Sequence, residues 1–239
     1  MLDQRPAANR LVAIFTLVAL GAIGGPHLLG ADQTATSPKP QLQVDLDATE
    51  VPEMQPWCQK GKETLEKAYP MIVERLSVEG YTPPRQIRLI FKKEMKGIAG
   101  TSGTRIVCAS AWFKAHPDDC GALVHELVHV VQAYPKYDPP WLVEGIADYV
   151  RCWLFEPGAK RPPLNPAKIR YQDGYKTTGA FLAWLTDKYD KDIVRKLNAA
   201  CHNDRYQETL FKDITGKDLD ALWSEFKATL PRRGAAQEK

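Results

Sequence analysis

The chain has 239 residues and a formal net charge of +3, with 32 basic and 29 acidic side chains. Because the basic side chains are scattered among acids, this composition gives no support for binding to nucleic acid or to an anionic membrane. The length suits one domain with a sizeable core, flanked by short terminal segments.

The first 30 residues predict a secretory signal peptide. Arg5 and Arg10 precede an uncharged apolar run, Leu11 to Leu20, which is shorter than the roughly 20 residues that a membrane span needs. An uncleaved N-terminal anchor is the alternative, and no other membrane association is expected. In either case the rest of the chain is expected outside the cytoplasm, secreted or periplasmic.

Residues 31–52 are rich in turn formers, prolines and acids, which predicts a flexible spacer. The globular domain is expected over residues 53–230, followed by a disordered tail at 231–239. All five cysteines lie in the exported part, where an oxidising compartment would permit up to two disulfides. The sequence assigns no pairs, and for Cys108 and Cys152 a buried thiol in an apolar run is the alternative.

The order of predicted elements indicates an α+β fold. Residues 57–76 have helical spacing, in a helix that Pro70 is expected to divide in two. Residues 86–92 alternate polar and apolar side chains, as in a half-buried strand, and residues 104–110 form a second strand. Glycines between these strands favour a hairpin-like connection. The C-terminal third has helical spacing at residues 178–189, 192–200 and 217–230.

A His-Glu-Leu-Val-His sequence follows the strands, in an apolar helix expected to begin after Asp118 or Asp119. His125 and His129 are four residues apart and share one helix face, so both imidazoles can bind one metal ion. Burial of two histidines and a carboxylate would be costly without a partner, and a metal ion supplies one. Glu126, between the histidines, is the expected general base.

The segment Trp141 to Tyr149 is expected to form a returning helix with two acids on one face. Glu144 is the predicted third metal ligand, and Asp148 is expected to orient a ligand histidine from behind. Asp148, His116 or no residue at all are the alternatives for the third ligand.

Two histidines and one glutamate leave a fourth zinc position open for water, as in catalytic sites. The predicted function is that of a zinc-dependent peptidase, a monomer with one Zn²⁺ per chain, which cleaves peptides or proteins by zinc-activated water with Glu126 as base. Cobalt, nickel or copper could use the same ligands. Tyr175 is the candidate oxyanion donor, with Tyr171 and Tyr149 as alternatives and core packing as an equally open role.

A second hypothesis is a non-catalytic exported domain that binds zinc together with peptide or cell-wall ligands. Glu126 argues against it, because a domain that needs only the metal has no use for a base at that position.

These motifs resemble the basic secretory protein family of plants and its bacterial relatives, which are zinc metallopeptidases of the gluzincin-like kind. The resemblance covers about residues 56–228 and is carried by Val124–Gln132, Trp141–Arg151 and Gly174–Thr178 with Phe181 and Leu182. It implies a zincin-like fold, in which a small sheet places its edge strand next to a central HExxH helix and the C-terminal part is helical.

The resemblance also assigns the metal to His125, His129 and Glu144 and the base role to Glu126. The chain departs from the family at Thr178-Gly179-Ala180-Phe181, where Thr-Ala-Arg-Phe is expected. No arginine role is therefore transferred to this segment.

Overall fold

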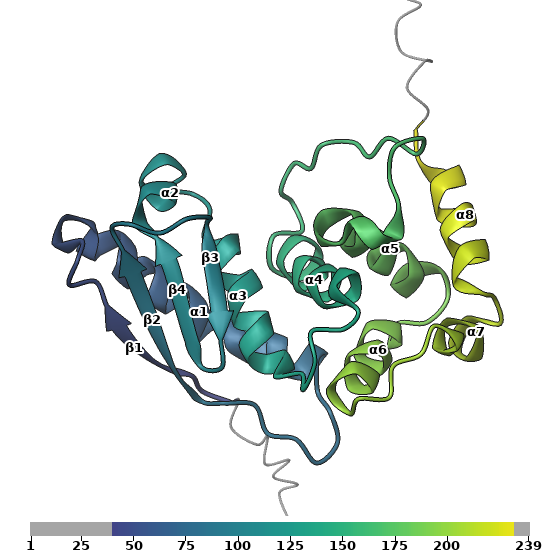
Figure 1. Cartoon of the computed structure of the whole chain (residues 1–239), viewed down its shortest axis with the longest axis horizontal. Helices are drawn as coiled ribbons and strands as arrows, with labels where there is room; N and C mark the ends of the chain where they lie inside the picture. The colour runs from purple at the N-terminus through teal and green to yellow at the C-terminus, as the bar shows by residue number, and fades with distance from the viewer. Residues whose placement is uncertain (1–39, 232–239) are drawn as a thin grey trace, which may run out of the picture. The chain divides into compact units, whose positions relative to one another are not determined.

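The computed structural model describes residues 40–231 and contains a four-stranded sheet in the first half of that range (Figure 1). The strands are β1 (Gln43–Asp47), β2 (Gln86–Lys92), β3 (Ala99–Ser102) and β4 (Arg105–Ala109), in the order β1-β2-β4-β3. β2 pairs in parallel with both β1 and β4, whereas β3 pairs antiparallel with β4. The class is thus α+β with a small mixed sheet, as predicted.

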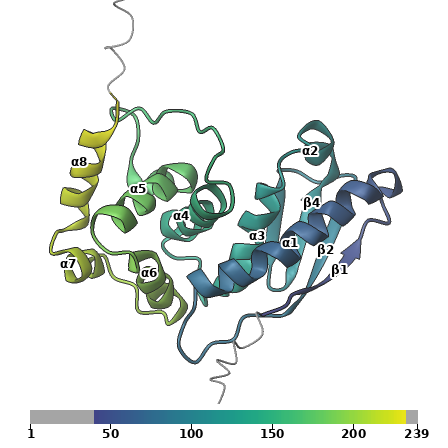
Figure 2. The same ribbon diagram turned by 180° about the vertical axis from the view of Figure 1, so that it is seen from behind.

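Helices account for most of the rest. In chain order they are a 3-10 turn at Pro52–Met54, α1 (Gln55–Arg75), α2 (Ser110–Ala115), α3 (Gly121–Gln132), α4 (Pro140–Tyr149), a π-helical segment at Val150–Phe155, a 3-10 turn at Tyr171–Asp173, α5 (Tyr175–Lys188), α6 (Ile193–His202), α7 (Thr209–Thr215) and α8 (Leu219–Thr229). α1 lies behind the sheet in Figure 1 and in front of it in Figure 2, so it covers one face of the sheet. α3 packs against α1, β3 and β4.

Over the described part of the expected flexible spacer, residues 40–52, β1 corrects the prediction. Leu42 and Val44 are buried, and Val44 lies opposite Ile87 of β2. The run Gln41 to Asp47 alternates polar and apolar residues, but its stability comes from pairing with a strand distant in sequence. The folded domain therefore begins before residue 53.

α1 corrects the expected break at Pro70, because one helix continues through that residue. Leu65, Tyr69 and Ile72 are almost fully buried on either side of the proline. Their packing offsets the backbone hydrogen bond that Pro70 cannot donate.

The connection between β2 and β4 is also different from the expected hairpin. These two strands are parallel, and the chain between them forms β3, which makes the hairpin with β4 instead. β3 has the sequence Ala-Gly-Thr-Ser, without the apolar alternation of a half-buried strand. It lies at the edge of the sheet, where one neighbouring strand is enough to hold it.

The helical second half is held together by close packing of α4 on α5. A Cβ at Gly145 would overlap Thr178 Cγ2 and would lie 2.5 Å from Thr178 Cβ, so only glycine fits at this contact. α5, α6 and α8 match the three predicted C-terminal helices within about three residues at each end, as is normal for helix termini. α7 was not predicted.

All five cysteines are buried and unpaired, which confirms the buried-thiol alternative for Cys108 and Cys152. The predicted signal peptide, residues 1–30, lies outside the described residues, as does most of the predicted tail. Between residues 40 and 231, no helix is long and apolar enough to cross a membrane.

Candidate metal centre

α3 is buried on nearly every side, and Asp119 lies just before its N-cap residue, Cys120. The Ala122 amide donates a hydrogen bond to Asp119 Oδ1 at 3.3 Å, which satisfies one free amide of the first turn as the sequence predicted. The helix ends at Gln132, and its C-cap residue, Ala133, has a left-handed backbone. The polar side chains of α3 lie mostly buried, and His125, Glu126, His129 and Gln132 line a cleft.

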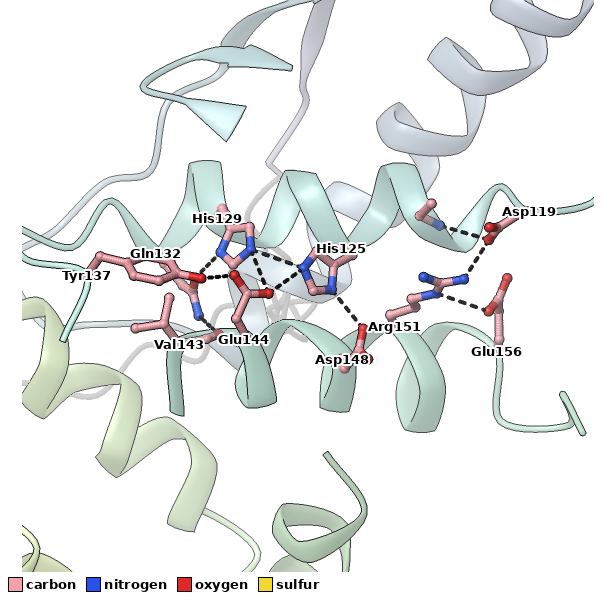
Figure 3. A network of polar contacts seen from close by, with 11 residues as sticks. Asp119, His125, His129, Gln132, Tyr137, Val143, Glu144, Asp148, Arg151 and Glu156 are labelled. Atoms are coloured by element: carbon pink, nitrogen blue, oxygen red, sulfur yellow. Dashed lines mark hydrogen bonds and ion pairs between the residues drawn. The ribbon is translucent and has the colours of Figure 1, made fainter. Parts of the chain in front are cut away.

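Three ligand atoms from α3 and α4 converge at the centre of this interface (Figure 3). The Nε2 atoms of His125 and His129 are 3.1 Å apart. Glu144 Oε2 lies 3.0 Å from His125 Nε2 and 3.6 Å from His129 Nε2. These are the three residues that the sequence predicted as ligands, and the structure brings them together in a group that could hold a metal ion.

Each ligand side chain is held from behind by another side chain. His125 Nδ1 lies 2.8 Å from Asp148 Oδ1, and His129 Nδ1 lies 2.7 Å from Gln132 Oε1. The Tyr137 hydroxyl donates to Glu144 Oε1, the second oxygen of that carboxylate. Asp148 thus lies where the sequence predicted, next to a histidine ligand and not within the group itself.

The electrostatics of the group favour a cation. Burial lowers the pKa of His125, but hydrogen bonds with Asp148 and Glu144 raise it to about 9 on balance. Burial raises the pKa of Glu144, and the two imidazoles lower it to about 2 on balance. The raised pKa of His125 and the lowered pKa of Glu144 both mean that a positive charge is stabilised between these side chains. A bound divalent cation would supply that charge in place of a proton.

The donor set also fits a divalent metal ion. Asp148 accepts a hydrogen bond from His125 Nδ1, and Gln132 accepts one from His129 Nδ1. In the neutral imidazoles, the Nε2 atoms therefore carry the lone pairs. Two such lone pairs and a carboxylate oxygen within 4.8 Å of one another repel unless a cation lies among them. Two imidazoles and a carboxylate are ligands that zinc and its first-row neighbours accept.

Glu126 lies beside the ligands and is bound by the sheet. Thr101, on the edge strand β3, places its Oγ1 2.7 Å from Glu126 Oε2 and 3.0 Å from the Glu126 carbonyl oxygen. Because the threonine has one hydroxyl proton, the charge-assisted bond to the carboxylate is the stronger of the two. Glu126 is therefore held facing the cleft next to the histidines.

A cleft of about 1170 Å³ opens over the group. It is lined by Thr101 and Gly100 of β3, by the ligand residues and Glu126, and by Tyr137 and Tyr175. Tyr175 is 55 % exposed, and its ring is nearly parallel to that of His125 with centroids 6.0 Å apart.

The other candidates of the sequence lie elsewhere. Tyr149 accepts a hydrogen bond from Arg75, and Tyr171 packs against Trp141 and Trp223. Neither tyrosine lines the cleft. His116 stacks on Trp112 and does not belong to the metal-binding group.

Three residues of the site were not predicted: Thr101, Gln132 and Tyr137. Gln132 could have been predicted from the sequence, because it follows His129 by three residues on the same helix and so lies on the same face. Thr101 had none, because β3 lacks a strand pattern, and Tyr137 lies in the loop between the two helices.

The fold and the site define an α+β protein in which two histidines of one buried helix and a glutamate of the next line an open cleft and could hold a metal ion there. A model of the family described as peptidases of plants and bacteria (BSP) matches residues 54–226. The chain belongs to this family, which confirms the resemblance to the basic secretory proteins. No curated protein matches the chain.

Proposed function

We propose that the chain is a secreted zinc-dependent metallopeptidase with a zincin-like fold. The observation that carries the proposal is the convergence of His125, His129 and Glu144 in a cleft that also presents Glu126. The position of β3, an edge strand packed beside α3, supports the zincin-like fold. The apolar run and basic residues within residues 1–30 support secretion.

His125, His129 and Glu144 would hold one Zn²⁺, with Asp148 behind His125. When bound, such an ion lowers the pKa of a water molecule and polarises a carbonyl oxygen. The residues fit zinc by ligand type, and the family description as peptidases supports a peptide or protein as the substrate.

Glu126 would act as the general base and then as the general acid. Its carboxylate, bound at one oxygen by Thr101, takes a proton from the attacking water and passes it to the amine that leaves when the peptide bond breaks. A carboxylate that accepts one hydrogen bond from Thr101 keeps lone pairs free for this transfer.

Glu126→Gln tests the proposal. The amide is similar in shape but cannot accept the proton, so cleavage of a denatured protein substrate is expected to fall by about 100-fold or more. Metal content, measured on the same sample by atomic absorption, is expected to stay at one ion per chain, because Glu126 is not a member of the ligand group. Wild-type activity in the variant would contradict the base role. Bound metal in a wild type that cleaves nothing would favour the non-catalytic alternative.

Tyr175 is the proposed donor to the oxyanion of the tetrahedral intermediate. It lines the cleft above His125, and it has a φ of 45°, a conformation that costs energy for a residue other than glycine and is often kept at functional sites. Burial and the nearby carboxylates raise its pKa, which keeps the hydroxyl protonated as a donor.

Tyr175→Phe is expected to lower kcat by roughly 10- to 100-fold without loss of metal. Tyr137→Phe is the matched comparison, because that hydroxyl bonds to Glu144 and should affect metal affinity first. If kcat falls further in the metal-loaded Tyr137→Phe protein than in Tyr175→Phe, Tyr137 and not Tyr175 is the oxyanion donor.

A further inference from the structure

Gln132 is the last residue of α3, and its buried side chain lies between His129 and the start of α4 (Figure 3). Its Oε1 lies 2.7 Å from His129 Nδ1, and its Nε2 donates a hydrogen bond to the Val143 carbonyl oxygen at 3.1 Å. One amide thus connects a histidine of the metal-binding group to the residue just before Glu144.

The two hydrogen bonds of Gln132 fix its orientation. The Val143 carbonyl can only accept, so the amide nitrogen must face it, and the amide oxygen must face His129. An amide oxygen can only accept as well, so His129 carries its proton on Nδ1. The lone pair of His129 is then on Nε2, the atom that points at His125 and Glu144.

The backbone of Gln132 is held from a third helix. The Gln132 carbonyl oxygen accepts a hydrogen bond from His202 Nδ1 of α6 at 2.9 Å. Gln132 therefore has fixed contacts to α3, α4 and α6, so little freedom remains for the His129 ring that it binds.

We propose that Gln132 is a positioning residue that sets the tautomer and the ring orientation of His129, and through them the affinity of the site for a divalent metal ion. The inference rests on the proposed function in one respect, since it requires His129 to bind the metal. Gln132 does for His129 what Asp148 does for His125, but it does so with a neutral amide.

Two substitutions distinguish the positioning of His129 from a purely structural hydrogen bond between α3 and α4. Gln132→Met keeps the length of the side chain but removes the acceptor for His129, so zinc affinity is expected to fall by about 10- to 100-fold. Gln132→Glu keeps that acceptor and loses the donor to Val143, so zinc affinity is expected to match or exceed that of the wild type, although the protein unfolds more easily.

Zinc affinity is measured on the full exported chain by competition with a chromophoric chelator, and thermal unfolding of the metal-free proteins is recorded beside it. Tyr69→Phe is the control, because it removes a partly buried hydrogen bond to the Pro84 carbonyl without changing any residue of the metal-binding group. It should lower stability and leave zinc affinity unchanged.

A wild type that binds zinc and a Gln132→Met protein that binds it equally well would overturn this inference alone. Equal loss of zinc affinity in the Met and Glu variants would also overturn it, because the hydrogen bond to the Val143 carbonyl is absent from both. A wild type without zinc affinity would overturn the proposed function as well.

A spectroscopic signature checks the tautomer directly. In a long-range ¹H–¹⁵N spectrum of the zinc-loaded wild type, His129 is expected to carry a slowly exchanging proton on Nδ1. Exchange of that proton should be fast in Gln132→Met. A proton on His129 Nε2 in the wild type would contradict the proposal.

Discussion

At the scale of single residues, two reactive side chains of α3, those of His125 and Glu126, depend on partners outside the helix. Asp148 of α4 lies behind His125, and Thr101 of β3 binds Glu126. A helix alone fixes the spacing of its side chains, but ring and carboxylate orientation need a second contact. The partners therefore decide how well the site is preorganised.

Thr101→Val should lower kcat roughly tenfold, because it removes the one hydroxyl that binds the Glu126 carboxylate, and a hydrogen bond to a charged group contributes about 1.5 kcal/mol. Valine has nearly the same shape, so KM and metal content should change little. Steady-state kinetics on a peptide substrate measures both constants. Thr101→Ser restores the hydroxyl and should restore most of kcat, whereas a valine variant with normal kcat would exclude the contact from catalysis.

At the scale of elements, the contact between α4 and α5 determines where Glu144 lies. Gly145 follows Glu144 directly and packs against Thr178, and Gly179 of α5 approaches the backbone of α4 near Tyr149. The two glycines let the helices come close, so α5 serves as the support for the helix that carries the third ligand.

Gly145→Ala is expected to destabilise the fold in spite of a gain of about 1 kcal/mol in helix propensity. The new methyl group would overlap Thr178, and overpacking of this kind costs about 1–3 kcal/mol. A shift of α4 should also weaken metal binding. Thermal unfolding and metal content measure both effects, with Gly158→Ala, where a Cβ meets no atom within 4 Å, as the neutral control. An alanine variant as stable as the wild type would mean that α4 and α5 pack less closely.

The sequence predicted the elements whose pattern is local. The His-Glu-Leu-Val-His motif identified α3, and the spacing of four placed His125 with His129 and Glu144 with Asp148 on shared helix faces. It missed β1 and β3, because their stability comes from pairing with strands elsewhere in the chain. Thr101 was missed for the same reason, since its contact with Glu126 exists only once β3 has paired.

At the scale of the whole molecule, the metal-binding group connects α3, which packs beside the sheet, with α4, the first helix of the second half. His125 and His129 belong to α3, which packs on β3 and β4, whereas Glu144 belongs to α4, which packs on α5. A metal ion bound by both helices therefore stabilises the folded chain. At a free concentration 100 times its Kd, such an ion adds about 2.7 kcal/mol to the free energy of unfolding.

The most direct test of the proposed function is the metal content of the purified chain, measured beside His129→Ala and Glu144→Ala, with cleavage of a denatured protein followed in the same samples. Circular dichroism confirms that each variant is folded. We expect one zinc ion per wild-type chain, and loss of both zinc and cleavage in each folded variant. A wild type without metal, or folded variants that keep it, would contradict the proposed metal site.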